Sequence, residues 1–479
     1  MKAFRAALIW GLLFPLTALA HVGSKDVFQQ VTAGQYKLFV TVRMPNVIPG
    51  VANVEVRSTG APVSSLSITP LPITGEASKH PPTPDAMKAS AVDPAFFTGG
   101  VWMMSSGSWQ IRLQIAGTSG EEVVSVPVPA VAIATLQMQR NLGLPLAFLG
   151  LFLVISMAGV IGAAVREARL PAGETPTPRL RHRGLVATIA GLAIMVLAVW
   201  GGAKWWNVEA ASYAEGIYRP PAVSAMLSGN LLDLRVKELV AGDRWEAKSS
   251  AALILDHGKI IHLYAIRMPE MDAAYHLHPD YDAPSDFRMA LPAMPPGEYF
   301  LYGDVVHANG FPETLTAKLE VPADMLGAPA GPDDAYAHPT SVDQGPLGNS
   351  YKLPDGYSMV WDKPETLTAN TAYSFRFHLL APDGSAATDM QPYLGMAGHA
   401  AFVKTDGTVF AHTHPDGSAA MPALMLANGM AGGMEMPSGP LTNVVEFPYG
   451  FPKPGAYRIF VQMKHGSTVE TGVFDAAVQ

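Results

Sequence analysis

The sequence contains no cysteine, which excludes a disulfide framework, a zinc ribbon, an iron–sulfur cluster and a thiol nucleophile. Charged residues are also scarce, at 15% of the 479 residues, whereas soluble proteins contain about a quarter. We therefore expect part of the apolar content to lie in a membrane. The net charge of −8 gives no electrostatic footprint for nucleic acid, so no nucleic-acid partner is expected. Any chemistry must use histidine, methionine, carboxylate or hydroxyl side chains.

Glycine and proline are abundant instead, with 45 and 41 residues, which favours many short strands joined by turns. The length predicts about three domains at ~150 residues each. In the segment 109–115, Trp109, Ile111, Leu113 and Ile115 share one face of a strand and polar residues occupy the other. Residues 21–140 are therefore predicted to form a β-sandwich of immunoglobulin-like type.

The first 20 residues have the pattern of a signal peptide. Lys2 and Arg5 form a basic region, the run 6–16 is apolar, and small residues end the segment at Ala20. Cleavage after Ala20 would make His21 the first residue of the mature protein.

Two longer apolar runs, 141–165 and 184–203, are each long enough to cross a hydrocarbon core of ~30 Å. The intervening loop, 166–183, contains five arginines against two glutamates, so the positive-inside rule places it in the cytoplasm. We therefore expect a two-helix transmembrane hairpin in a bacterial inner membrane, with both large soluble regions in the periplasm.

The C-terminal part contains an internal repeat. The segment 262–267 (HLYAIR) aligns with 399–404 (HAAFVK), and each is followed by a His-x-His-Pro sequence at a nearly equal distance. Strand-like segments then align without a gap up to His307 and His465. This predicts two further β-domains, 222–325 and 350–479, joined by a Pro/Gly/Asp-rich linker, 326–349. The expected fold is mainly β, with three immunoglobulin-like β-sandwich domains and the transmembrane hairpin.

Four histidines occupy matching places in the two repeats. Residues i and i+2 of a strand point to the same face, so each His-x-His pair projects together, and the following proline ends the strand. Convergent neutral imidazoles suit Cu(II), Zn, Fe or Ni, and disfavour Ca and Mg. We expect one transition-metal ion in each repeat, bound less well as the pH drops below the ~6.5 reference pKa of histidine. The predicted ligands are His262, His276, His278 and His307 in the first repeat, and His399, His412, His414 and His465 in the second.

Methionines favour copper over zinc as the bound ion. Thioether sulfur is a soft ligand that selects Cu(I), and no thiol competes with it here. The alternative use of these side chains is apolar packing. They lie in one Gly/Pro-containing segment after the second His-x-His pair, at Met421, Met425, Met430, Met434 and Met436.

His21 is a further predicted ligand, because a free N-terminal amine and its own imidazole can chelate one ion, as in histidine-brace copper proteins. His80 and the pair Met103-Met104 are weaker candidates for this N-terminal site, and His257 is a candidate fifth ligand with no counterpart in the second repeat. No ligand role is expected for His182, His338 and His378.

Two other interpretations remain open. The first is a metal-dependent redox or oxygenase enzyme of cupin-like chemistry, since cupins also place His-x-His on a strand. Cupins add a glutamate a few residues later, whereas Pro279-Asp280 and Pro415-Asp416 follow here. The second is a structural or adhesion β-sandwich module whose histidines bind no metal.

Several motifs resemble a known class of domains. The segment 394–399, the His-Thr-His-Pro sequence at 412–415 and the segment 447–452 (FPYGFP) are similar to bacterial periplasmic β-sandwich domains termed YtkA-like or FixH-like. The resemblance covers about half of the chain and implies copper handling or oxidase assembly. The sequence therefore predicts a membrane-anchored periplasmic metal-binding protein, for copper or alternatively zinc, that sequesters the ion or delivers it to a partner protein.

Overall fold

The computed structural model describes residues 25–136, 138–237, 253–283, 286–430 and 441–479. The chain forms two compact units, one made of residues 1–131 with 219–479 and the other of residues 132–218. The predicted signal peptide and His21 lie outside the described residues.

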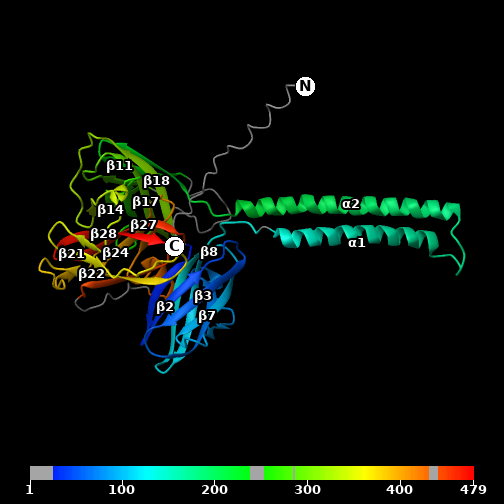
Figure 1. Cartoon of the computed structure of the whole chain (residues 1–479), viewed down its shortest axis with the longest axis horizontal. Helices are drawn as coiled ribbons and strands as arrows, with labels where there is room; N and C mark the ends of the chain where they lie inside the picture. The colour runs from blue at the N-terminus through cyan, green and yellow to red at the C-terminus, as the bar shows by residue number, and fades with distance from the viewer. Residues whose placement is uncertain (1–24, 137, 238–252, 284–285, 431–440) are drawn as a thin grey trace, which may run out of the picture. The chain divides into compact units, whose positions relative to one another are not determined.

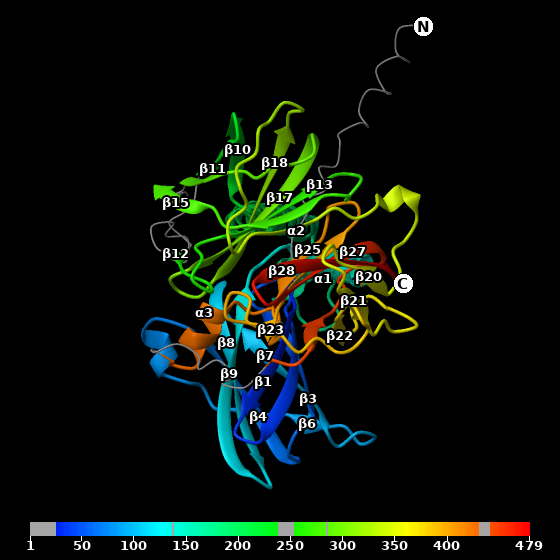
Figure 2. The ribbon, with the colours of Figure 1, turned by 90° about the vertical axis from the view of Figure 1, so that its left-hand side faces the viewer.

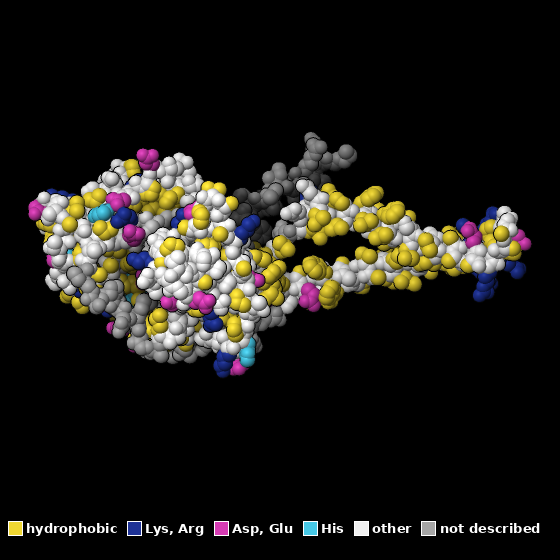
Figure 3. Space-filling model, turned by 90° about the horizontal axis from the view of Figure 1, so that it is seen from below, with side chains coloured by type: hydrophobic (Ala, Val, Ile, Leu, Met, Phe, Trp, Pro, Cys, Tyr) yellow, Lys and Arg dark blue, Asp and Glu magenta, His cyan; other side chains and the backbone are white. Residues whose placement is uncertain are grey.

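The smaller unit contains two long apolar helices, α1 (Arg140–Glu167) and α2 (Pro178–Glu215), which lie side by side and antiparallel (Figure 1). They approach through small residues: a Cβ added at Gly162 would lie 2.0 Å from Thr188 Oγ1. Thr177 caps α2 by accepting a hydrogen bond from the Leu180 N–H. Both helices are long and apolar enough to cross a membrane. Apolar side chains cover them, and Lys and Arg side chains gather at the turn that joins them (Figure 3). The prediction of two long apolar helices that form a hairpin is therefore confirmed.

Over the part of the chain that the structure describes, the larger unit contains six sheets, which pair into three β-sandwiches as predicted. One sheet of the first sandwich has the order β1-β2-β3-β7-β6 and the other β5-β4-β8-β9. A short helix, η1 (Glu76–Lys79), follows β4. The strands are β1 (Val27–Ala33), β2 (Tyr36–Arg43), β3 (Gly50–Ser58), β4 (Val63–Pro72), β5 (Asp85–Ala86), β6 (Lys88–Ala89), β7 (Phe96–Met103), β8 (Gly107–Gly117) and β9 (Gly120–Ala130). In β8, Ile111, Leu113 and Ile115 are buried, as their alternation with polar residues predicts.

The second sandwich places a four-stranded sheet, β10-β11-β16-β15, against a larger sheet of order β12-β17-β13-β14-β19, in which β18 also pairs with β17. Strand β19 comes from the predicted linker, which therefore completes this sheet. The strands are β10 (Ala222–Ser228), β11 (Leu231–Lys237), β12 (Leu253–Ile254), β13 (His262–Arg267), β14 (Ala274–Leu277), β15 (Asp280–Ala283), β16 (Asp286–Ala290), β17 (Gly297–His307), β18 (Pro312–Val321) and β19 (Ala335–Ala337).

The third sandwich has the same plan, with the sheet β20-β21-β22-β26 against β23-β27-β24-β25 and β28 beside β27. Its elements are η3 (Val342–Gln344), which precedes it, α3 (Met421–Ala427), and the strands β20 (Ser350–Lys352), β21 (Ser358–Trp361), β22 (Tyr373–Leu380), β23 (Met390–Gln391), β24 (His399–Lys404), β25 (Phe410–Thr413), β26 (Val444–Tyr449), β27 (Gly455–His465) and β28 (Thr468–Val478).

The repeats pack against each other through their larger sheets. Strands β13 and β24 are buried at every position but the last, so both faces of each sheet are covered. One face of each sheet packs inside its own sandwich, and the other packs against the neighbouring repeat (Figure 2). Tyr264, Tyr302, Phe410 and Phe460 form the core of this second contact, which we call the repeat interface.

Arg458 joins the repeats by polar contacts across the repeat interface. Its side chain is fully buried, forms two hydrogen bonds of 2.8 Å with Asp475, and donates to the carbonyl oxygens of Met271 and Thr340. A buried charge needs such compensation, and breaking one partner of a buried pair costs about 3–5 kcal/mol.

We therefore expect Arg458→Met to lower the free energy of unfolding by about 3 kcal/mol, because it removes the buried cation that pairs with Asp475 and the donor to two carbonyl oxygens. Denaturant titration of the full chain in detergent measures the change. Arg376→Met, which removes a half-exposed arginine paired with Glu446, is the matched control and should change stability by less than about 1 kcal/mol. Equal effects of the two substitutions would contradict this account.

The first sandwich also contacts the third. Phe28 in β1 is buried in the core of the third sandwich, where its ring packs edge-on against Tyr449. The loop that follows His414 is bound to β1 by backbone hydrogen bonds, from Gln30 N–H to the Asp416 carbonyl and from Ser418 N–H to the Phe28 carbonyl. Gly417 permits this approach, since an added Cβ would lie 2.3 Å from the Phe28 oxygen.

Candidate metal centre

Seven histidines gather at the repeat interface, and their side chains are almost completely buried. They are the first three of the four predicted ligands along each repeat, together with His257. We call them the histidine cluster: His257, His262, His276, His278, His399, His412 and His414. The i, i+2 prediction is confirmed, because the ring centres of His276 and His278 lie 4.6 Å apart and those of His412 and His414 lie 4.7 Å apart. Each following proline lies just beyond the end of its strand, β14 or β25.

The first triad consists of His262, His276 and His278, with one ring nitrogen of each within 4.8 Å of the others. The tautomers follow from the hydrogen bonds. His262 Nε2 lies 3.2 Å from the Asp256 carbonyl oxygen, so this nitrogen donates and Nδ1 carries the lone pair. His276 Nδ1 lies 2.8 Å from Gln462 Oε1, which leaves the lone pair on Nε2.

These two lone pairs face each other. His262 Nδ1 and His276 Nε2 are 3.1 Å apart, although neither carries a proton to share. Two nitrogens that bind one tetrahedral ion at ~2.0–2.1 Å are about 3.3 Å apart, so the separation suits two ligands of the same ion. His278 completes the pattern: Nδ1 lies 3.2 Å from Asp334 Oδ1, and Nε2 has no hydrogen-bond partner in the described part of the chain.

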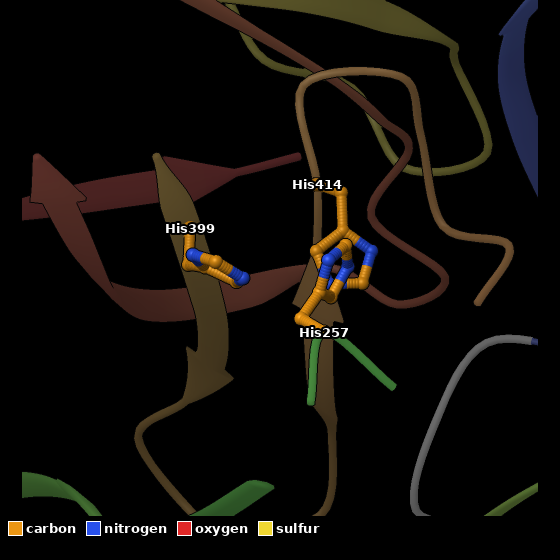
Figure 4. Close-up of side chains that lie close together, drawn as sticks. All are labelled: His257, His399 and His414. Carbon is orange, nitrogen blue, oxygen red and sulfur yellow. The ribbon is translucent and has the colours of Figure 1, made fainter. Parts of the chain in front are cut away.

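The second triad consists of His257, His399 and His414, whose side chains converge from a turn, from strand β24 and from the loop after β25 (Figure 4). Their ring centres are 4.9–5.6 Å apart. Neither ring nitrogen of His399 has a hydrogen-bond partner among the residues described. His257 Nε2 also lacks one, although it lies 3.3 Å from Asp256 Oδ1.

His412 lies between the triads. Its ring centre is 5.2 Å from that of His262 in the first triad, and 5.4 and 4.7 Å from those of His399 and His414 in the second. Its Nδ1 is 3.4 Å from Asp304 Oδ2, and its buried Nε2 has no hydrogen-bond partner within the described ranges.

Burial favours the neutral form of six of the seven imidazoles. Removal from water, reinforced by neighbouring rings, lowers the pKa of His262, His276, His399 and His414 well below 6.5, and lowers that of His257 to about 4. Neutral imidazole is the form that binds metal, so proton competition should begin at a lower pH than the sequence alone predicts. Among the neighbouring carboxyls, burial raises the pKa of Asp256 to about 7.

The structure does not bring His307 and His465 together with the other three predicted ligands of their repeats, and His465 lies instead in a separate group with Asp355 and Glu470 that could hold an ion. His262 pairs with Asp304 on β17, so its side chain lies on the face opposite to that of Val305 and His307. His307 is instead bound to Glu313 at 2.9 Å. In the second repeat His399 pairs with Gln462, whereas His465 shares the face of Met463 and lies between Asp355 and Asp389.

His257 has a structural counterpart after all. It occupies a tight turn with φ 51°, followed by Gly258 at 79°, and Leu394 and Gly395 form the same turn with φ 49° and 78°. Each turn lies five residues before the first histidine of its repeat. A non-glycine residue at positive φ is uncommon, and histidine is among the types enriched there. The sequence feature that indicates this turn is the glycine that follows it in both repeats, Gly258 after His257 and Gly395 after Leu394.

The remaining candidates lie outside the histidine cluster. Met421 begins α3 and its backbone N–H donates to the Asp256 carboxyl, Met425 is partly buried, and Met430 is exposed. Met434 and Met436 lie outside the described residues. His80 is exposed beside Glu76, Met103 is buried and Met104 is exposed in the first sandwich, His338 contacts Tyr275, and His378 is bound to Asp362.

Comparison with known proteins gives little further information. Residues 351–479, which form the third sandwich, match the family described as "Domain of unknown function (DUF8832)". No curated protein matches the chain. The chain is similar to dimeric latent PorU from Porphyromonas gingivalis, at 8% identity and a TM-score of 0.15, over 95% of this chain and 34% of that one.

The chain is also similar to a putative membrane anchored protein from Corynebacterium diphtheriae, at 9% identity and a TM-score of 0.15, over 94% of each chain. An endo-fucoidan hydrolase from glycoside hydrolase family 107 is similar at 9% identity and a TM-score of 0.14, over 91% of this chain and 43% of that one. The chain thus spans about a third of PorU and less than half of the hydrolase. Similarities this weak carry no functional argument.

Proposed function

We propose that the protein is a membrane-anchored transition-metal-binding protein that sequesters or delivers its ion, with copper as the preferred metal and zinc as the alternative. The first triad is the observation that carries the proposal. In each of its three rings, one nitrogen donates its N–H to an oxygen of the protein. The other nitrogen carries a lone pair that is available to an ion. Such hydrogen bonds from the nitrogen that faces away from the ion are typical of metal-binding histidines, because they fix the orientation of the ring.

The all-imidazole set favours the late first-row metals. Neither triad includes a carboxylate among the described residues, as a two-His-one-carboxylate iron centre requires, so the donors favour binding over cupin-like oxygenase chemistry. Divalent affinities rise to Cu(II) and fall at zinc, which supports copper. The resemblance to YtkA-like and FixH-like domains points the same way.

The proposed location is the periplasmic side of a bacterial inner membrane. The arginine-rich loop 166–183 would face the cytoplasm, and the signal-peptide pattern at residues 1–20 would direct the following region across the membrane. Both ends of the hairpin then leave the larger unit outside, where a periplasmic partner could receive the ion.

Metal analysis of the full chain in detergent tests the proposal. After chelator treatment, loading with Cu(II) and dialysis, we expect at least one tightly bound copper ion per chain, retained against equimolar Zn(II). His276→Ala with His278→Ala should lower the copper content, whereas His378→Ala, which removes a partly exposed histidine outside the cluster, should leave it unchanged. Less than half an equivalent of copper or zinc in the unmodified protein would refute the proposal.

A further inference from the structure

The histidine cluster contains more ligands than one ion can use. Its two triads have no residue in common, and each alone supplies three nitrogens within 4.8 Å of one another. A structural transition-metal site takes about four ligands. Seven imidazoles are therefore too many for one ion. They correspond to two sets of three ligands, one for each of two ions, and one additional histidine.

The triads also adjoin. The His262 and His399 ring centres are 6.0 Å apart and those of His276 and His399 are 5.9 Å apart, compared with up to 5.6 Å within a triad. The rings of the two triads are therefore direct neighbours. Two ions held by the triads would therefore be neighbours.

His412 is placed to serve both triads. Its unpartnered Nε2 is buried, and its ring lies at similar distances from members of each. Rotation of one ring could complete either coordination sphere, so a change at His412 should affect both.

Carboxylates around the cluster supply compensating charge. Asp334 is bound to His278, Asp304 lies beside His412, and Asp256 Oδ1 lies beside His257 with no hydrogen-bond partner in the described structure. Each carboxylate faces a different part of the cluster. Two dications in one buried site need such anions, because their mutual repulsion is poorly screened there.

From this arrangement we propose that the histidine cluster is a two-ion centre, in which the first and second triads each bind one transition-metal ion and His412 is shared between them. The inference rests on the proposed function and adds the number and proximity of the ions. The centre is assembled only when the two repeats pack together, since the second triad takes His257 from one repeat and His399 and His414 from the other.

Copper titration of the full chain in detergent, followed by metal analysis and EPR spectroscopy, tests this proposal. We expect two copper ions per chain, and a spectrum that changes at the second equivalent because two nearby Cu(II) spins couple. His276→Ala with His278→Ala, and separately His399→Ala with His414→Ala, should each leave one ion and an uncoupled spectrum. His378→Ala should keep both ions and the coupling.

His412→Gln provides the second arm, with unfolding monitored by circular dichroism so that loss of fold is recognised. Both binding steps should weaken, by roughly tenfold or more, if the residue serves both ions. One ion per chain, or two ions with additive uncoupled spectra, would overturn the two-ion centre while leaving metal binding intact. No bound ion would overturn the proposed function itself.

Discussion

Acidification below about pH 6.5, where the histidines of an unfolded chain begin to take up protons, should unfold the metal-free protein. Burial lowers the pKa of six members of the histidine cluster in the folded protein, His412 being left out. The unfolded chain therefore binds more protons than the folded one, and stability falls as the pH falls. The window extends downward to the folded pKa values, which for His257 is about 4.

Buried carboxyls oppose this effect, because burial raises the pKa of Asp26, Asp256, Asp416 and Glu470 in the folded protein. For Asp256 and Glu470 the pKa reaches about 7, so near pH 5.5 the folded state holds two protons that the unfolded state lacks. Unfolding then takes up about four protons net, which corresponds to a slope on the order of 5 kcal/mol per pH unit. Since domains are stable by only about 5–15 kcal/mol, one to three pH units should suffice for unfolding.

Denaturant midpoints of the chelator-treated full chain, measured between pH 7 and pH 4.5, give this slope. His378→Ala removes one partly exposed imidazole outside the cluster and is the control variant for this measurement. A slope corresponding to the uptake of less than one proton would show that the cluster is not held neutral in the folded state.

Replacement of His399 by leucine should stabilise the metal-free protein by about 1–3 kcal/mol, the cost of a buried polar group without a partner. Both ring nitrogens of His399 lack hydrogen-bond partners among the described residues, and the side chain is fully buried. Leucine is similar in volume and adds apolar surface at the repeat interface. The same substitution removes a ligand of the second triad, so stabilisation by added copper should fall.

His276→Leu is the matched control and should have the opposite sign. Its ring donates to Gln462 at 2.8 Å and Tyr264 stacks on it at 4.2 Å, so the substitution removes a buried hydrogen bond and an aromatic contact. Thermal and denaturant unfolding of both variants, with and without chelator, distinguish the two cases. Destabilisation of the metal-free protein by both substitutions would indicate that His399 has a structural role instead.

Much of the fold could be predicted from local patterns. The alternation in 109–115, the apolar runs at 141–165 and 184–203, and the repeated strand segments each depend on residues near one another in the chain. The pairing of six sheets into three sandwiches followed from the repeat and the turn composition. Helix α2 extends beyond residue 203 to Glu215, because a hydropathy pattern marks the apolar span and leaves the end of the helix undefined.

The site was harder to predict because it depends on which face of a sheet meets another domain. The sequence HLYAIR is apolar on both faces, so it does not tell which face lies inside the sandwich. The sequence pattern therefore predicts one ion for His262 and His307, although the two side chains lie on opposite faces of the sheet. The contribution of β19 from the linker and the insertion of Phe28 into the third sandwich are likewise long-range contacts with no local signal.

The repeat interface also has a kinetic consequence. The histidine cluster is buried where the two repeats pack together, so an ion bound there as proposed would leave only when the repeats separate or a loop that carries a histidine opens. The loop that carries His414 is fastened to β1 of the first sandwich, which raises the cost of that opening. Metal release should then proceed at a rate that an external chelator does not accelerate. Such a protein would release its ion at a rate set by the local opening of its own structure.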